Sequence, residues 1–184
     1  MEMKRVCFLL TALLLLSLSS CKRLSVMKEM KNVIGSTVTL PDNMELFKGL
    51  PKYDNSSTPK SSIIVWYDST MCSACKLSGM DNLDGLEAFC HDSLKDVNVN
   101  IIFSPLSKTS DPFREAIIRT EHNYPIYLDS CQSFFEANPQ LPSSFYLHTL
   151  LLDKDNKVVL CGDPIPNRSM WEAYKKHLRL LTQD

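Results

Sequence analysis

A nearly unbroken run of β-branched and aromatic residues, Ser62–Tyr67, is the feature that most constrains the fold of this chain. Such a run is typical of a central strand that is covered on both faces. Beyond it, apolar residues recur at three- and four-residue steps between residues 77 and 94, which predicts a helix with one apolar face. Residues 97–103 first alternate between apolar and polar side chains and then become continuously apolar, which predicts a second strand. Strand, helix and strand in this order predict a βαβ unit with a parallel, right-handed connection, and hence the α/β fold class.

Local patterns predict the remaining elements. Asp111 as N-cap and Pro112 at the first helical position favour a helix over residues 111–122. Residues 153–156 have the composition of a hairpin turn between two strands. An amphipathic pattern predicts a last helix over residues 168–181. The other expected strands lie at residues 37–40, 125–128, 144–152 and 157–161.

The N-terminal residues form a separate unit. Lys4 and Arg5 precede an apolar run over residues 6–18, and Leu18–Cys21 follows as Leu-Ser-Ser-Cys. This pattern predicts a signal peptide, because the run is shorter than the roughly 20 residues that cross a bilayer as a helix. The Leu-Ser-Ser-Cys sequence resembles the lipobox of bacterial lipoproteins, in which the cysteine is acylated and becomes the first residue of the mature chain. The resemblance implies a lipid on Cys21; a plain secretory signal is the alternative.

The expected organisation follows from this resemblance. Residues 1–20 are expected to be a lipoprotein signal peptide, residues 21–36 a lipid-anchored tether, and residues 37–184 one domain, with order beginning near Gly35. The protein would be anchored to a membrane of the bacterial cell envelope. Lys22 and Arg23 do not resemble the acidic surface-export signals of some lipoproteins, which favours the periplasmic face.

Charge and cysteine content exclude other classes of protein. The chain carries 20 Lys+Arg and 21 Asp+Glu, and no basic stripe that could follow a phosphate backbone, so we expect no nucleic-acid partner. Of its seven cysteines, Cys7 would leave with the signal peptide and Cys21 would carry lipid. The odd number that remains favours one reactive pair among buried or spare thiols over a disulfide scaffold: Cys72, Cys75, Cys90, Cys131 and Cys161.

Cys72 and Cys75 form a Cys-Ser-Ala-Cys motif where the first strand gives way to the helix. A cysteine at a helix N-terminus has a lowered pKa, because free N–H groups and the helix dipole favour the thiolate. Cys72 is therefore the expected nucleophile, and Cys75, one helical turn later, the expected resolving thiol. A structural disulfide or half of a metal site are the alternatives, although no second Cys-x-x-Cys motif is present.

Three segments together resemble the thioredoxin-like superfamily. They are Trp66–Cys75, Tyr124–Asp129, and Leu141–Phe145 ahead of Leu151–Val159, in that order along the chain. The match is closest to the lipid-anchored thioredoxin-like and redoxin proteins of Bacteroidetes, and it covers roughly residues 35–182. It implies a thioredoxin-like fold, with a central mixed sheet flanked by helices.

The resemblance also implies a site. In the family, the proline that corresponds to Pro142 is cis and faces the cysteine pair, and the backbone of the preceding residue, Leu141, pairs with the substrate chain. The expected activity is thiol-disulfide exchange with protein thiols or disulfides. A membrane or periplasmic electron donor is expected to supply the electrons. We expect no cofactor, no resident metal and a monomer.

Several positions depart from the family pattern. Met71 replaces a common tryptophan, Ser73–Ala74 replaces Gly-Pro, and Trp66 lies where cytoplasmic thioredoxins have a buried acid. Asp68 is therefore not assigned as a general base. A hydroxyl residue three positions before Cys72 is a feature of peroxiredoxins, but Val65 stands where their motif has proline.

Two other functions remain as alternatives. One is a thiol-dependent peroxidase, with Arg114 or Arg119 stabilising the thiolate. The other is a non-enzymatic lipoprotein that binds a soft metal such as Cu(I) at the cysteine pair. Among the other residues, Cys90 and Cys161 are expected to pack in the core. Cys131 is expected to be a partly buried spare thiol, with an extra resolving thiol as the alternative. The four histidines are expected at the surface or hydrogen-bonded.

Overall fold

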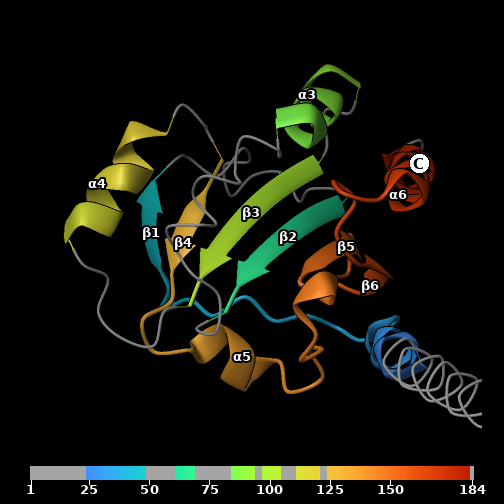
Figure 1. The fold of residues 1–184 in the computed structure, drawn as a ribbon, viewed down its shortest axis with the longest axis horizontal. Coiled ribbons are helices and arrows are strands. Elements are labelled where there is room, and N and C mark those ends of the chain that lie inside the picture. The colour runs from blue at the N-terminus through green and yellow to red at the C-terminus, as the bar shows by residue number, and fades with distance from the viewer. Residues whose placement is uncertain are drawn as a thin grey trace, which may run out of the picture.

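The computed structural model describes residues 24–48, 61–68, 84–93, 97–104, 111–120 and 124–182 (Figure 1). Residues 24–33 form a helix. The elements that follow are β1 (Glu45–Lys48), β2 (Ser61–Tyr67), α3 (Asp84–Ser93), β3 (Val97–Phe103), α4 (Asp111–Arg119), β4 (Ile126–Leu128), α5 (Ser133–Ala137), the 3-10 helix η2 (Phe145–Leu147), β5 (Thr149–Asp153), β6 (Val158–Cys161) and α6 (Arg168–Thr182).

The strands form one mixed sheet in the order β1-β4-β3-β2-β5-β6. β2 and β3 pair in parallel along their whole length, from Ser61 opposite Val97 to Tyr67 opposite Phe103. β3 and β4 are also parallel, whereas β5 and β6 form an antiparallel hairpin beside β2. The predicted βαβ unit, the hairpin and the α/β class are therefore confirmed.

Alternate residues of β2 point into two different cores. Ile63 and Val65 pack with α3, α4 and α6 on one face of the sheet. Ile64 and Trp66 pack on the other face, with α5 and the helix of residues 24–33. In Figure 1, α4, α3 and α6 lie across the upper half of the view, and α5 and the N-terminal helix lie in the lower half. This alternation carries Trp66 to the end of β2 on the second face, where the site lies.

Most of the segment expected to be a tether, from residue 24 on, lies in the described part of the chain and packs on the domain. Residues 24–33 are helical, and Val33 is fully buried against the second face of the sheet, with Val26 and Met30 packed beside it. The expected start of order near Gly35 is therefore wrong. The spacing of Val26, Met30 and Val33, at i, i+4 and i+7, gives this helix an apolar stripe whose burial stabilises it.

Other boundaries differ from the sequence predictions in detail. Of residues 37–40, only Thr37 forms a bridge, opposite Lys157. The strand expected from residue 144 begins at Thr149, because residues 145–147 form η2 instead. The helix expected to reach residue 122 ends at Arg119, and β1 and α5 were not predicted. Within the described ranges, no helix is long and apolar enough to cross a membrane.

Candidate functional site

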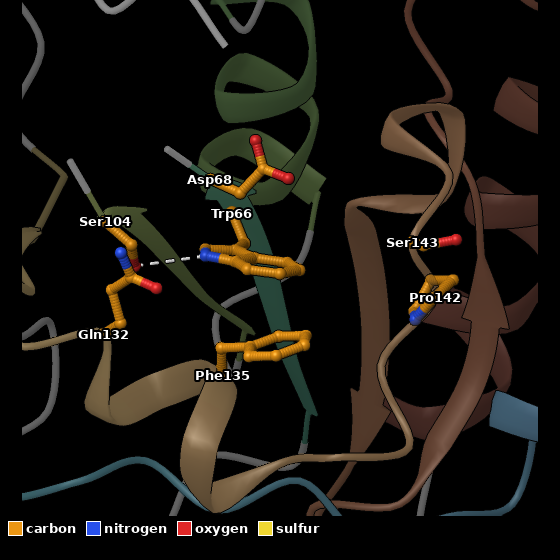
Figure 2. Close-up of a pocket in the computed structure, with 7 residues that line it drawn as sticks. All are labelled: Trp66, Asp68, Ser104, Gln132, Phe135, Pro142 and Ser143. Carbon is orange, nitrogen blue, oxygen red and sulfur yellow. Dashed lines mark hydrogen bonds between the residues drawn. The ribbon is translucent and has the colours of Figure 1, made fainter. Parts of the chain in front are cut away.

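A cavity of about 270 Å³ lies where β2 and β3 end (Figure 2). In sheets with parallel strands, the carboxyl ends of the strands are the usual place for a binding site. The end of β2, the residue that follows it and the residue that follows β3 line the cavity. The turn into α5 and α5 itself form one side, and the loop before η2 forms the opposite side. The lining residues are Trp66, Asp68, Ser104, Gln132, Phe135, Pro142 and Ser143.

Trp66 forms the floor of this cavity. The residue is 4% exposed, and its indole stacks on the ring of Phe135, with centroids 5.8 Å apart and planes 19° apart. His148 lies 4.3 Å from the indole, centroid to centroid, and Phe134 meets it edge-on at 5.7 Å. Phe135 is 45% exposed, so an aromatic surface is open to a ligand. Figure 2 shows Pro142 and Ser143 across the cavity from this stack.

A chain of hydrogen bonds holds the indole from behind. The Trp66 Nε1–H group donates to Ser104 Oγ at 3.2 Å, and the Ser104 hydroxyl donates to Asp129 Oδ2 at 3.1 Å. Asp129 is 2% exposed. Its carboxylate also accepts bonds from the Ser133 N–H and hydroxyl groups and from the Phe134 N–H group, at 2.9, 2.7 and 2.9 Å. A buried carboxylate with these donors is well satisfied, so it fixes both Ser104 and the start of α5.

Gln132, also in the cavity wall, has a left-handed backbone conformation with φ of 56°. A residue other than glycine adopts this conformation at some cost in energy, and such residues are frequent at functional sites. The backbone N–H group of Gln132 donates to the Asp129 carbonyl at 3.3 Å. The Asp129 carboxylate accepts from the N–H groups of the next two residues, Ser133 and Phe134. Asp129 therefore stabilises the turn that brings Gln132 and Phe135 to the cavity.

The loop on the other side of the cavity contains the two residues expected to bind substrate. Pro142 is buried and lines the cavity. The peptide bond that precedes it is trans, so the expectation of a cis bond is wrong. The trans bond is the intrinsically favoured form. Here the Leu141 N–H group donates to the Asn138 carbonyl at 3.0 Å, and the Pro142 carbonyl lies 3.1 Å from His148 Nε2. The Leu141 amide is therefore engaged within the protein.

The cysteine pair and the lipidation site lie outside the described residues. This holds for Cys72, Cys75 and Cys21, so their roles stay predictions. In the sequence, Cys72 follows Asp68 by four residues, and Asp68 lines the cavity. Asp68 is thus the described residue that stands nearest to the motif in the sequence.

The other cysteines divide into two buried thiols and one exposed thiol. Cys90 and Cys161 are buried in the two cores, as predicted. The Cys161 thiol donates to the Leu147 carbonyl at 3.2 Å, and burial, together with the nearby Glu29 carboxylate, raises its pKa to about 12. Cys131 is exposed, which corrects the expectation of a partly buried residue; it precedes Gln132 in a surface turn.

The arginines considered for a peroxidase lie on α4. Arg114 pairs with Glu45 on β1 at 2.5 Å and covers the ring of Phe47. Arg119 is exposed and pairs with Glu115 at 3.2 Å. Neither belongs to the residues that line the cavity. In the part of the chain that the structure describes, no cluster of three or more His, Cys, Asp or Glu side chains could hold a metal ion.

Sequence reasoning missed most of the cavity. Ser104, Asp129 and His148 had no assigned role beyond a general expectation for the histidines. His148 is buried and hydrogen-bonded, which agrees with that expectation. Asp129 had a recognisable signal, because it follows a short apolar strand and precedes Ser133 by four residues. An aspartate in such a position commonly accepts hydrogen bonds from the backbone N–H groups of the turn that follows it.

Comparison with solved structures identifies the architecture. A thioredoxin-like protein in the oxidised form has a TM-score of 0.52 at 16% identity, and the match covers 81% of this chain and 97% of that one. The chain has the thioredoxin-like fold. A candidate thiol:disulfide interchange protein DsbE from Chlorobium tepidum is also similar to the chain, with a TM-score of 0.52 at 10% identity over 80% of this chain and 97% of the other.

A candidate protein disulfide isomerase from Bacteroides thetaiotaomicron is similar to the same degree. Its TM-score is 0.52 at 16% identity, and the match covers 82% of this chain and 91% of that one. No protein-family model and no curated protein sequence matches the chain significantly. These structural similarities place the cavity within a thioredoxin-like fold.

Proposed function

We propose that this chain is an extracytoplasmic, membrane-anchored thiol-disulfide oxidoreductase that uses Cys72 as nucleophile and Cys75 as resolving thiol. The observation that carries the proposal is the aromatic-floored cavity at the end of β2, whose wall residue Asp68 precedes the Cys-x-x-Cys motif by four residues. The names of two similar structures, a thiol:disulfide interchange protein and a protein disulfide isomerase, support the same chemistry.

The proposed reaction has two exchange steps. The Cys72 thiolate attacks one sulfur of a client disulfide, the client S–S bond breaks, and the departing client thiolate takes up a proton. The Cys75 thiolate then attacks Cys72 in the mixed disulfide, which releases the second client thiol. The client gains two electrons and the enzyme becomes a Cys72–Cys75 disulfide. A dithiol donor reduces that disulfide again and completes the cycle.

The cavity would hold the client beside the reacting disulfide. Phe135 and Trp66 offer an aromatic surface for an apolar side chain, and Pro142 and Ser143 form the facing wall. Because the Leu141 N–H group is bonded to Asn138, the client backbone would use the Leu141 carbonyl as its partner in this conformation. Substrate binding at Leu141 and Pro142 is thus proposed to depend on one backbone acceptor and on apolar contact.

The N-terminal sequence supports the proposed location. Only Lys22 and Arg23 separate the expected lipid-bearing Cys21 from Leu24, the first residue that the structure describes. Three residues span at most about 10 Å, so a lipid on Cys21 would hold the domain close to the membrane surface. The periplasmic side of the cell envelope, which is kept oxidising, suits a disulfide exchange enzyme.

The test compares three activities of one purified protein. The mature chain is extracted from bacterial membranes in detergent and assayed for insulin reduction with dithiothreitol, for peroxide consumption and for Cu(I) binding. We expect insulin reduction that is lost in Cys72→Ser. Peroxide consumption without insulin reduction would favour the peroxidase, and stoichiometric Cu(I) binding without turnover would favour a metal-binding protein. Intact insulin reduction in Cys72→Ser would refute the proposed function.

A further inference from the structure

The N-terminal segment is bonded to the loop that forms one wall of the cavity. Glu29, on the helix of residues 24–33, accepts a hydrogen bond from the Ser144 N–H group at 3.0 Å through Oε2. The same oxygen accepts from the Ser143 hydroxyl at 3.3 Å. Ser143 lines the cavity, and Pro142 precedes it. A single carboxylate oxygen therefore binds two adjacent residues of the loop that forms this wall.

Two further contacts join the same segments. Asn138 is fully buried; its Oδ1 accepts from the Thr39 N–H group at 2.7 Å, and its Nδ2 donates to the Thr39 carbonyl at 2.8 Å. Gln140 Nε2 donates to the Thr37 carbonyl at 2.8 Å. The loop of residues 138–144 is thus bonded at its start, its middle and its end by residues 29–39.

Apolar packing reinforces these bonds. Val33 and Val38 of the N-terminal segment belong to the same buried cluster as Leu141 of the loop and Leu147 of η2. Residues 138–144 have no helix or strand of their own. Their conformation consequently depends on the segments that bind them.

We propose that Glu29 is a positioning residue for the client-binding loop, and that the contacts of this loop with Glu29, Thr37 and Thr39 therefore belong functionally to the site. This inference rests on the proposed function. By fixing Ser143 and Ser144, Glu29 holds Pro142 and the Leu141 carbonyl ready for a client chain. A loop that is already ordered binds with a smaller loss of conformational entropy, so its benefit appears as tighter client binding.

The first test separates positioning from chemistry. Reduction of a disulfide-containing peptide is measured at increasing peptide concentration with the membrane-extracted chain. In Glu29→Ala we expect KM to rise about three- to tenfold while kcat stays within about twofold, as for the loss of charge-assisted hydrogen bonds outside the reacting atoms. Glu29→Gln keeps an oxygen that accepts both bonds and should restore KM to within about twofold of the wild type. Lys31→Ala, an exposed change on the same helix, is the matched control.

The second test reads the contact without activity. Hydrogen exchange at the Ser144 amide should be about tenfold faster in Glu29→Ala than in the wild type, and unchanged in Lys31→Ala. An unchanged KM in Glu29→Ala, with an active wild type, would overturn the positioning role alone. Equal loss of kcat in Glu29→Ala and Glu29→Gln, with lower thermal stability, would also overturn it, because that pattern is structural. An inactive wild type would refute the proposed function itself, whatever the exchange rate.

Discussion

Asp129 provides the strongest stability prediction, because a single buried carboxylate organises one side of the cavity. In Asp129→Ala, the Ser104 hydroxyl and the Ser133 and Phe134 N–H groups lose their acceptor in a region where Asp129 itself is 2% exposed. Hydrogen bonds to charged groups contribute about 1.5–3 kcal/mol each, and relief from burying the charge offsets part of their loss. We therefore expect the free energy of unfolding to fall by about 3–4 kcal/mol.

The measurement is urea unfolding followed by circular dichroism, with a thermal scan beside it. A loss of this size corresponds to a decrease in Tm of about 10 °C for a chain of this length. Asp129→Asn keeps one acceptor oxygen and should lose about half as much. Glu136→Ala is the control: it removes an exposed carboxylate from α5, the helix that follows Asp129, and should change stability by less than about 0.5 kcal/mol. A loss below about 1 kcal/mol in Asp129→Ala would refute the reasoning.

Two further predictions concern β6 and its end. Burial raises the pKa of Cys161 from its ordinary value of 9.0 to about 12. Above about pH 9 the unfolded chain loses this proton and the folded chain keeps it, so the thiol's contribution to stability falls by about 1.3 kcal/mol between pH 8 and pH 10. Cys161→Ser should remove that part of the pH dependence in urea titrations, and Cys131→Ser, an exposed control, should leave it unchanged. Gly162 has φ of 132°, and an added Cβ would lie 3.0 Å from Met170 Cε, so Gly162→Ala should cost about 1–3 kcal/mol. Gly85→Ala, in α3 with open space around the new Cβ, should be neutral or stabilise the protein by up to about 1 kcal/mol; equal effects of the two glycine substitutions in thermal scans would contradict the strain argument.

The central part of the fold could be predicted because its pattern is local and strong. A strand covered on both faces must be apolar along its length, and Ser62–Tyr67 shows this directly. The following helix and the strand of residues 97–103 then fix a parallel neighbour, which the structure contains as β3. The hairpin between β5 and β6 was similarly predictable from its turn, where Asn156 adopts φ of 58°.

The second face of the sheet was less predictable, because it depends on contacts between distant segments. The helix of residues 24–33 has only a short apolar stripe, so it is stable when it packs on the sheet, and its mixed and basic composition led to the prediction of a tether. The role of Asp129 depends on Ser104, which lies on another strand end. Likewise, the bond before Pro142 is trans where the sequence resemblance implied cis, in a loop that residues 29–39 hold in place.

The chemistry at the cysteine pair is the central claim, and trapping of its first intermediate tests it most directly. Cys75→Ser removes the thiol that would resolve the mixed disulfide, so an adduct with a disulfide-bonded peptide should accumulate. Peptide mapping by mass spectrometry locates the modified residue, and the exposed Cys131 provides an internal competitor. We predict the peptide on Cys72 in Cys75→Ser and no adduct in the Cys72→Ser, Cys75→Ser double variant. An adduct mainly on Cys131, or none on Cys72, would contradict the account.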